Sequence, residues 1–140
     1  MNDTSTMRGL ITSAVGALEG WTQSRWGPDL FGRDTDHLMH HTYTVAVTDT
    51  QVHNRDGRQR VSEGLLVTSK VQVLWAHRLR GDAQQDDYDG ALDAEQSVTA
   101  ACRAISDSHV LIDSMTRRTA MEGWVLGTIT LSVLHRYSLT

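Results

Sequence analysis

The chain has 140 residues, of which 39% are hydrophobic and 21% charged, so it is long enough for one domain with its own core and too apolar for general disorder. Nucleic-acid-binding proteins usually have an excess of basic residues, whereas this chain has a formal net charge of −4. The single cysteine, Cys102, excludes an internal disulfide and a thiolate metal cage. We therefore expect a single domain over residues 1–140.

The sequence shows no sign of a membrane or secretory protein. It has no basic leader followed by an apolar core, and no run of 18 apolar residues. We expect no membrane partner and a protein that folds in a reducing cytoplasm.

The first predicted element is an amphipathic helix that begins near residues 4–6. Its apolar residues recur at steps of three and four; they are Met7, Leu10, Ile11, Ala14, Val15, Leu18 and Trp21. Residues 22–39 contain the only proline and no clean period, so we expect an irregular connection there.

Two strands are predicted next, because apolar and polar residues alternate over residues 40–48 and 65–80. A strand of sixteen residues would span ~53 Å at about 3.3 Å per residue. A compact domain of this length is only about 37 Å across if it is spherical. We therefore expect residues 49–64 to be the tip of a long β-hairpin that projects from the body.

The second half of the chain predicts a helix and two further strands. Asp86, Asp87 and Asp89 follow a polar turn and indicate a helix start, where carboxylates are favoured. Residues 109–119 predict a short strand and turn, and residues 124–139 a long final strand. The order α-β-β-α-β-β predicts an α+β fold, with two helices packed on a mainly antiparallel sheet.

Histidines are the candidates for chemistry. His37, His40 and His41 have a spacing compatible with metal, but no Cys or Glu accompanies them in a recognised pattern, so we predict no metal site. His77 and His135 each follow an apolar strand pattern and precede an arginine. We expect both imidazoles on one face near one end of the sheet, at a core margin or subunit contact. No Ser, Cys or carboxylate stands at a spacing that suggests a nucleophile beside either.

The arginines are candidates for contacts between chains. Arg55, Arg58 and Arg60 place three positive charges on the predicted hairpin tip, where they are either solvated or in contact with an acidic partner. Arg78 and Arg136 project to the face opposite the histidines, where carboxylates of a neighbouring chain could meet them. We assign an oligomer or partner contact to the residues Arg55, Arg58, Arg60, His77, Arg78, Arg80, His135 and Arg136.

The order of these elements resembles the small tail-terminator (tail-completion) proteins of long-tailed bacteriophages. The resemblance extends over nearly the whole chain and depends on element order and on the style of several stretches, without a diagnostic motif. These stretches are WGPDLFG, HHTYTVAV, VLWAHRLR, DAQQDDYDGALDAE and GWVLGTITLSVLHRYSL.

The resemblance implies a non-enzymatic virion protein of the tail or neck, made in the host cytoplasm. Such proteins form a homo-oligomeric ring, commonly a hexamer, that ends growth of the tail tube and joins the tail tube protein to the head connector protein. DNA would pass through the lumen without sequence-specific binding, and no catalytic residue, metal or cofactor is implied. The alternatives are another head–tail connector (a head-closure or adaptor protein), a small His-dependent hydrolase or isomerase, or a nucleic-acid-binding module that uses Arg55–Arg60.

Overall fold

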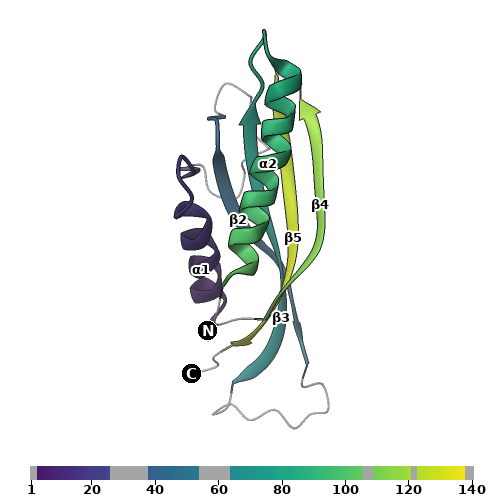
Figure 1. The fold of residues 1–140 in the computed structure, drawn as a ribbon. Coiled ribbons are helices and arrows are strands. Elements are labelled where there is room, and N and C mark those ends of the chain that lie inside the picture. The colour runs from purple at the N-terminus through teal and green to yellow at the C-terminus, as the bar shows by residue number, and fades with distance from the viewer. Residues whose placement is uncertain (1–2, 26–37, 54–63, 106–108, 121–122, 138–140) are drawn as a thin grey trace.

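The computed structural model describes residues 3–25, 38–53, 64–105, 109–120 and 123–137 (Figure 1). The α+β fold is confirmed, with two helices and one mainly antiparallel sheet. The elements in chain order are α1 (Thr4–Gly16), β1 (Thr22–Gln23), β2 (Thr42–Val52), β3 (Leu65–Arg78), α2 (Gln84–Arg103), β4 (His109–Ala120) and β5 (Trp124–Tyr137).

The strands lie in the order β1-β2-β3-β5-β4. The neighbours β2–β3, β3–β5 and β5–β4 are antiparallel, whereas β1 pairs in parallel with the start of β2. The sequence did not predict β1, because two polar residues, Thr22 and Gln23, carry no periodic signal. The chain order of the other elements agrees with the prediction.

Both helices cover the same face of the sheet and enclose the main core (Figure 1). α1 buries Met7, Ile11 and Val15, and α2 buries a row that includes Val98 and Cys102. These side chains meet alternate residues of the strands. Burial of one such aliphatic side chain contributes about 1.5–3 kcal/mol, so the core explains why two helices of modest propensity are held in place.

The face of the sheet away from the helices is mostly polar. It carries Lys70, which donates to Asp113 at 2.7 Å and to Ser132 at 2.8 Å. A small apolar cluster covers one end of this face; it consists of Leu38, Leu74, Ala76, Trp124 and Leu126. Within the described part of the chain, neither helix is both long and apolar enough to cross a membrane.

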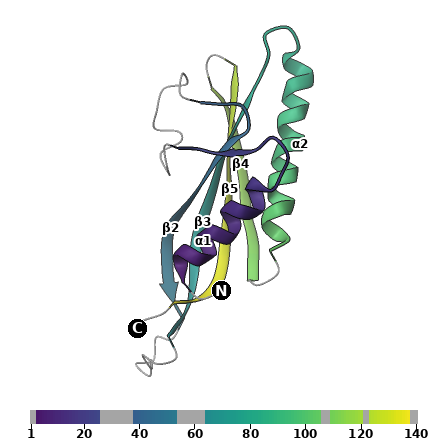
Figure 2. The same cartoon turned by 90° about the vertical axis from the view of Figure 1, so that its left-hand side faces the viewer.

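The projecting hairpin is not confirmed. β2 stays paired with β3 as far as Val52, so residues 49–52 belong to the sheet and not to a separate tip. β3 is also paired with β5 along its whole length, so no described part of it leaves the sheet. The length estimate failed because it assumed a spherical body, whereas the sheet itself is long (Figure 2). Residues 54–63, which include Arg55, Arg58 and Arg60, lie outside the described residues.

Two register shifts keep the apolar residues of the outer strands on the helix side. One lies between Val47 and Asp49 in β2, and the other between Ile112 and Ser114 in β4. An extra residue at each point compensates for a break in the alternation of the sequence. β4 is therefore a strand of twelve residues, where the sequence predicted a short strand and a turn.

Candidate functional site

Three histidines from two neighbouring strand ends meet at one edge of the core. His77 is near the end of β3, and His40 and His41 directly precede β2. The antiparallel register pairs Thr42 with Ala76, which places the residues before β2 beside the end of β3. The main chain holds this arrangement, because the N–H of His41 donates to the carbonyl of Ala76 at 2.9 Å.

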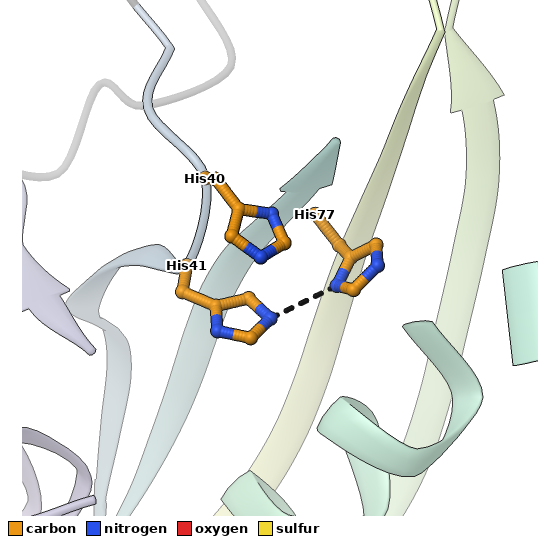
Figure 3. A group of neighbouring side chains, drawn as sticks. All are labelled: His40, His41 and His77. Carbon is orange, nitrogen blue, oxygen red and sulfur yellow. Dashed lines mark hydrogen bonds between the residues drawn. The ribbon is translucent and has the colours of Figure 1, made fainter. Parts of the chain in front are cut away.

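The imidazole rings contact one another (Figure 3). His41 Nε2 and His77 Nδ1 are 2.9 Å apart and share a hydrogen bond. The rings of His40 and His41 stack with centroids 3.8 Å apart, and the His40 ring meets the His77 ring edge-on at 4.6 Å. The indole of Trp21 lies parallel to the His41 ring at 4.3 Å on its other side. One ring nitrogen from each histidine lies within 4.8 Å of the other two.

His41 has an unusual backbone conformation, with φ 57°, and no other non-glycine residue in the described ranges has a positive φ. This left-handed conformation is uncommon outside glycine, although histidine tolerates it better than bulky residues do. It persists here because hydrogen bonds fix both sides of the residue: its N–H donates to Ala76, and its carbonyl accepts from the N–H of Thr22 at 3.0 Å.

The three imidazoles are held neutral. Burial, followed by the repulsion of a charged His40 and His77, lowers the pKa of His41 to about 4. Burial also lowers the pKa of His77, with a further contribution from His40, and burial lowers the pKa of His40 against the opposing attraction of Asp87. At neutral pH each ring therefore keeps one nitrogen lone pair for hydrogen bonding or metal ligation.

An open pocket of about 400 Å³ lies beside the cluster. It is lined by His40, His77, Arg78, Arg80, Asp87 and Gly90. Arg80 closes one side, since its main-chain N–H donates to Asp87 at 2.6 Å and its guanidinium to both carboxylate oxygens at 2.9 Å. The hydrogen bonds from Arg80 lower the pKa of Asp87 to about 2, so this wall of the pocket is a fixed ion pair.

Spacing along the chain does not reveal this cluster, because its third member comes from a distant strand. His37 lies outside the described residues, and the partner that joins His40 and His41 is His77, 36 residues away from His41. The signal that could have found it was the strand register, because a hairpin places the residue before one strand beside the end of the other.

His135 does not join His77, and the prediction that they share one end of the sheet is wrong. His77 pairs with Val125 and His135 with Val67, so they are ten residues apart along β3, or about 33 Å. Antiparallel pairing puts the equivalent ends of two strands at opposite ends of the sheet.

A serine does accompany His135, contrary to the sequence analysis. Ser69 Oγ is 2.7 Å from His135 Nε2 and 2.9 Å from Thr50 Oγ1, and His135 Nδ1 lies 2.8 Å from the carbonyl of Arg136. Ser69 and His135 are both buried. These hydrogen bonds satisfy the Ser69 hydroxyl and both ring nitrogens of His135.

The described arginines among those that the sequence assigned to a contact, Arg78, Arg80 and Arg136, do not all lie together. Arg78 lies over the ring of Trp124, with 5.5 Å from its Cζ to the ring centroid. Arg80 pairs with Asp87 of its own chain. Arg136 is next to His135 in β5 and lies opposite Leu66, twelve residues along β3 from Arg78. Arg78 and Arg80 line the pocket beside His77, whereas His135 and Arg136 lie at the other end of the sheet.

A second feature is the outer edge of the sheet. Among the described residues β4 pairs with β5 along one side only, and most of its side chains are exposed. Leu111 is 65% exposed and Met115 44% exposed. At the opposite edge, β1 covers only Thr42 and Tyr43 of β2, and Arg8 donates to the carbonyl of Val45 at 2.7 Å.

No protein-family model and no curated protein matches this sequence. Two solved structures of proteins from Akkermansia muciniphila are similar to it at 9% identity, with TM-scores of 0.41 and 0.40. They cover 69% and 72% of this chain, and the second was solved without its transmembrane region. The chain spans less than half of the length of each, 42% and 47%. A likeness of this size assigns neither a family nor a function.

Proposed function

We propose that this protein is a structural subunit that assembles through the edges of its sheet into a ring, and that the ring caps the head-proximal end of a phage tail tube. The observation that carries the assembly step is the open edge of β4. Its twelve residues pair on one side only within the described part of the chain, and the outward N–H and C=O groups of such a strand favour pairing with another chain.

Exposed apolar side chains make this edge a suitable contact. Leu111 points to the polar face of the sheet, since its neighbours Val110 and Ile112 pack against the helix-side core. Met115 lies beside α2, where Thr99 Oγ1 donates to its sulfur at 3.4 Å. A partner strand added to β4 would therefore bury apolar surface on both faces while it completes the backbone hydrogen bonds.

The two edges of the sheet favour a head-to-tail arrangement. Residues 46–52 of β2 have no strand partner on their outer side among the described residues, so β4 of one subunit can pair with β2 of the next. A contact between two different surfaces, repeated from subunit to subunit, closes a ring when the rotation permits it.

The place in a phage tail rests on the resemblance in element order to tail-terminator proteins. A ring that ends the tail tube needs no catalytic residues, only a surface for its own copies and one each for the tube and the head connector. Another head–tail connector protein has the same requirements, and its position in the particle distinguishes it from a terminator.

Light scattering with size-exclusion chromatography tests the assembly. We expect the protein, alone or with purified tube protein, to have a mass that is a multiple of 15.6 kDa. Charged residues at the edge, in the variant Leu111→Lys/Met115→Lys, should shift the mass to that of the monomer. They oppose strand addition without removing a core side chain.

The matched control is Tyr88→Lys, which charges an exposed aromatic side chain on α2, away from the edge, and should leave assembly intact. A wild-type monomer both alone and with tube protein would contradict the ring. Electron microscopy of tubes grown with the protein tests the second step, because a terminator should cap one end and limit their length. Capping by the charged edge variant would show that β4 is not the contact.

A further inference from the structure

We propose that His40, His41 and His77 form a binding site for a divalent transition-metal ion of the Zn²⁺ class. The proposal is independent of the ring, because it depends only on contacts within one chain. Neutral imidazole nitrogens are common ligands for Zn²⁺ and for its neighbours in the transition series. Within the described residues these three histidines are the group of potential ligands whose atoms converge.

Two ligand atoms are nearly in position. His41 Nε2 and His77 Nδ1 are 2.9 Å apart across a shared proton. Two nitrogens on a tetrahedral zinc ion, each about 2.0–2.1 Å from the metal, lie about 3.3 Å from one another. Replacement of the shared proton by a metal therefore requires the two nitrogens to separate by only about 0.4 Å.

The third ligand comes from His40, which is exposed and can turn. Its Nδ1 accepts a hydrogen bond from the main-chain N–H of Arg78 at 3.1 Å, and its Nε2 points toward the space between the other two rings (Figure 3). Ligation through Nε2 moves the ring proton to Nδ1. The ring would then turn away from Arg78, whose N–H is at the exposed end of β3 and can bond to water.

The side of His77 away from the cluster is already arranged as in a metal ligand. Since Nδ1 faces His41, Nε2 faces α2, where it would lie 3.6 Å from a Cβ at Gly90 and where the main chain of Asp87 raises the pKa of His77 against the effect of burial. Ligating histidines commonly donate their second ring N–H to a backbone carbonyl, which fixes the tautomer and the orientation of the ring. With the ring proton of His77 on Nε2, ligation through Nδ1 leaves that proton in place, and the proton shared with His41 moves from its Nε2 to its Nδ1.

The backbone of His41 gives a second, independent indication. Residues kept in sparsely populated conformations cost about 1–3 kcal/mol and cluster at functional sites and ligand clamps. The φ of 57° at His41, held by two main-chain hydrogen bonds, turns consecutive imidazoles toward His77. The pocket beside His40 and His77 offers an entry path and a position for water as the fourth ligand, the open arrangement of three-histidine zinc sites.

Calorimetric titration of untagged protein with ZnCl₂, after removal of metal with EDTA, tests the site. We expect one ion per chain and a higher melting temperature in Zn²⁺ that EDTA reverses, because a ligand that binds the folded state stabilises it. The variant His41→Asn keeps a residue that tolerates a positive φ but lacks the imidazole. It should raise the Kd by at least about tenfold, as loss of a supporting residue alone costs ten- to a hundredfold.

His77→Ala removes a buried side chain and can impair folding, so His40→Ala, at an exposed position, provides the second ligand test with the same expected loss. The control is His109→Asn, at an exposed position of β4, which should bind Zn²⁺ like the wild type. Absence of binding at about 100 µM ZnCl₂, a concentration that would fill even a site far weaker than structural zinc sites, would overturn the proposal. Binding that both His41→Asn and His40→Ala leave unchanged would also overturn it.

Discussion

Trp75 and Gly127 form a cross-strand pair in which the large residue requires the absence of a side chain. They are partners in the β3–β5 register, and a Cβ on residue 127 would lie 2.1 Å from the indole. Trp75 is fully buried in the main core, so a shift of its ring would displace neighbouring core side chains. A glycine in a strand interior marks such a close approach.

We predict that Gly127→Ala destabilises the fold by at least about 1–3 kcal/mol, the usual cost of overpacking a core. Gly9→Ala is the matched control, since nothing lies within 4 Å of a Cβ at that position of α1. It should stabilise the protein by about 0.5–1 kcal/mol. Denaturant unfolding followed by circular dichroism measures both changes, and equal stability of the two variants would contradict the packing argument.

The histidine cluster predicts a loss of stability in acid. Because the pKa of His41 falls to about 4 from an ordinary 6.5, the unfolded chain takes up a proton at a higher pH than the folded protein does. The free energy of unfolding should therefore fall as the pH decreases from about 6.5 to about 4. The lowered pKa values of His40 and His77 act in the same direction, although Asp87 from α2 opposes them.

Urea unfolding of the EDTA-treated protein between pH 7.5 and 4.5 measures this effect. His41→Asn should reduce the slope of stability against pH in that window. Hydrogen bonds from Arg80 and Lys70 lower the pKa values of Asp87 and Asp113, respectively. These two carboxylates therefore lose their stabilising contribution only at more acidic pH. A wild-type stability that is flat from pH 7 to 5 would show that the imidazoles are not kept neutral.

At the scale of elements, the sequence predicted the helices and strands in which apolar residues recur with a regular period. The apolar period of the first helix and the alternation in β2, β3 and β5 correspond to real elements, because burial of one face gives both their pattern and their stability. β4 was predicted too short, since the extra residue between Ile112 and Ser114 interrupts its alternation. Glu95 interrupts the apolar face of α2, and it is buried because Arg117 of β4 donates to it at 3.0 Å.

The connection between β2 and β3 supports a prediction at the same scale. Deletion of His53–Arg60 should leave a folded body, because β2 and β3 remain paired as far as Val52 and Val67 and β3 stays paired with β5. We expect assembly to weaken, since the deletion removes Arg55, Arg58 and Arg60, the positive charges proposed to contact a neighbour. The melting temperature reports the stability of the body, and the mass from light scattering reports assembly. Normal assembly of the deletion variant would show that the β2–β3 connection takes no part in the contact between subunits.

At the scale of the whole molecule, the fold class could be predicted but the candidate site could not. Fold class follows from periods that each segment carries by itself. The histidine cluster depends on a register between segments 36 residues apart, and the separation of His77 from His135 depends on strand direction. Neither the register nor the strand direction can be inferred from the residue pattern of a single segment. The sequence also does not show which strands pair with β3, and for that reason the length of this strand suggested a hairpin that projects from the body.

The sheet order also determines when this molecule can acquire its structure during synthesis. β5 is the last strand in sequence, yet it lies between β3 and β4 and is the sole described partner of β4. A ribosome that has made residues 1–120 has produced β2, β3 and both helices, but β4 has nothing to pair with. The edge proposed for assembly therefore does not exist in the nascent chain, and self-association through it must wait until the final strand has been released.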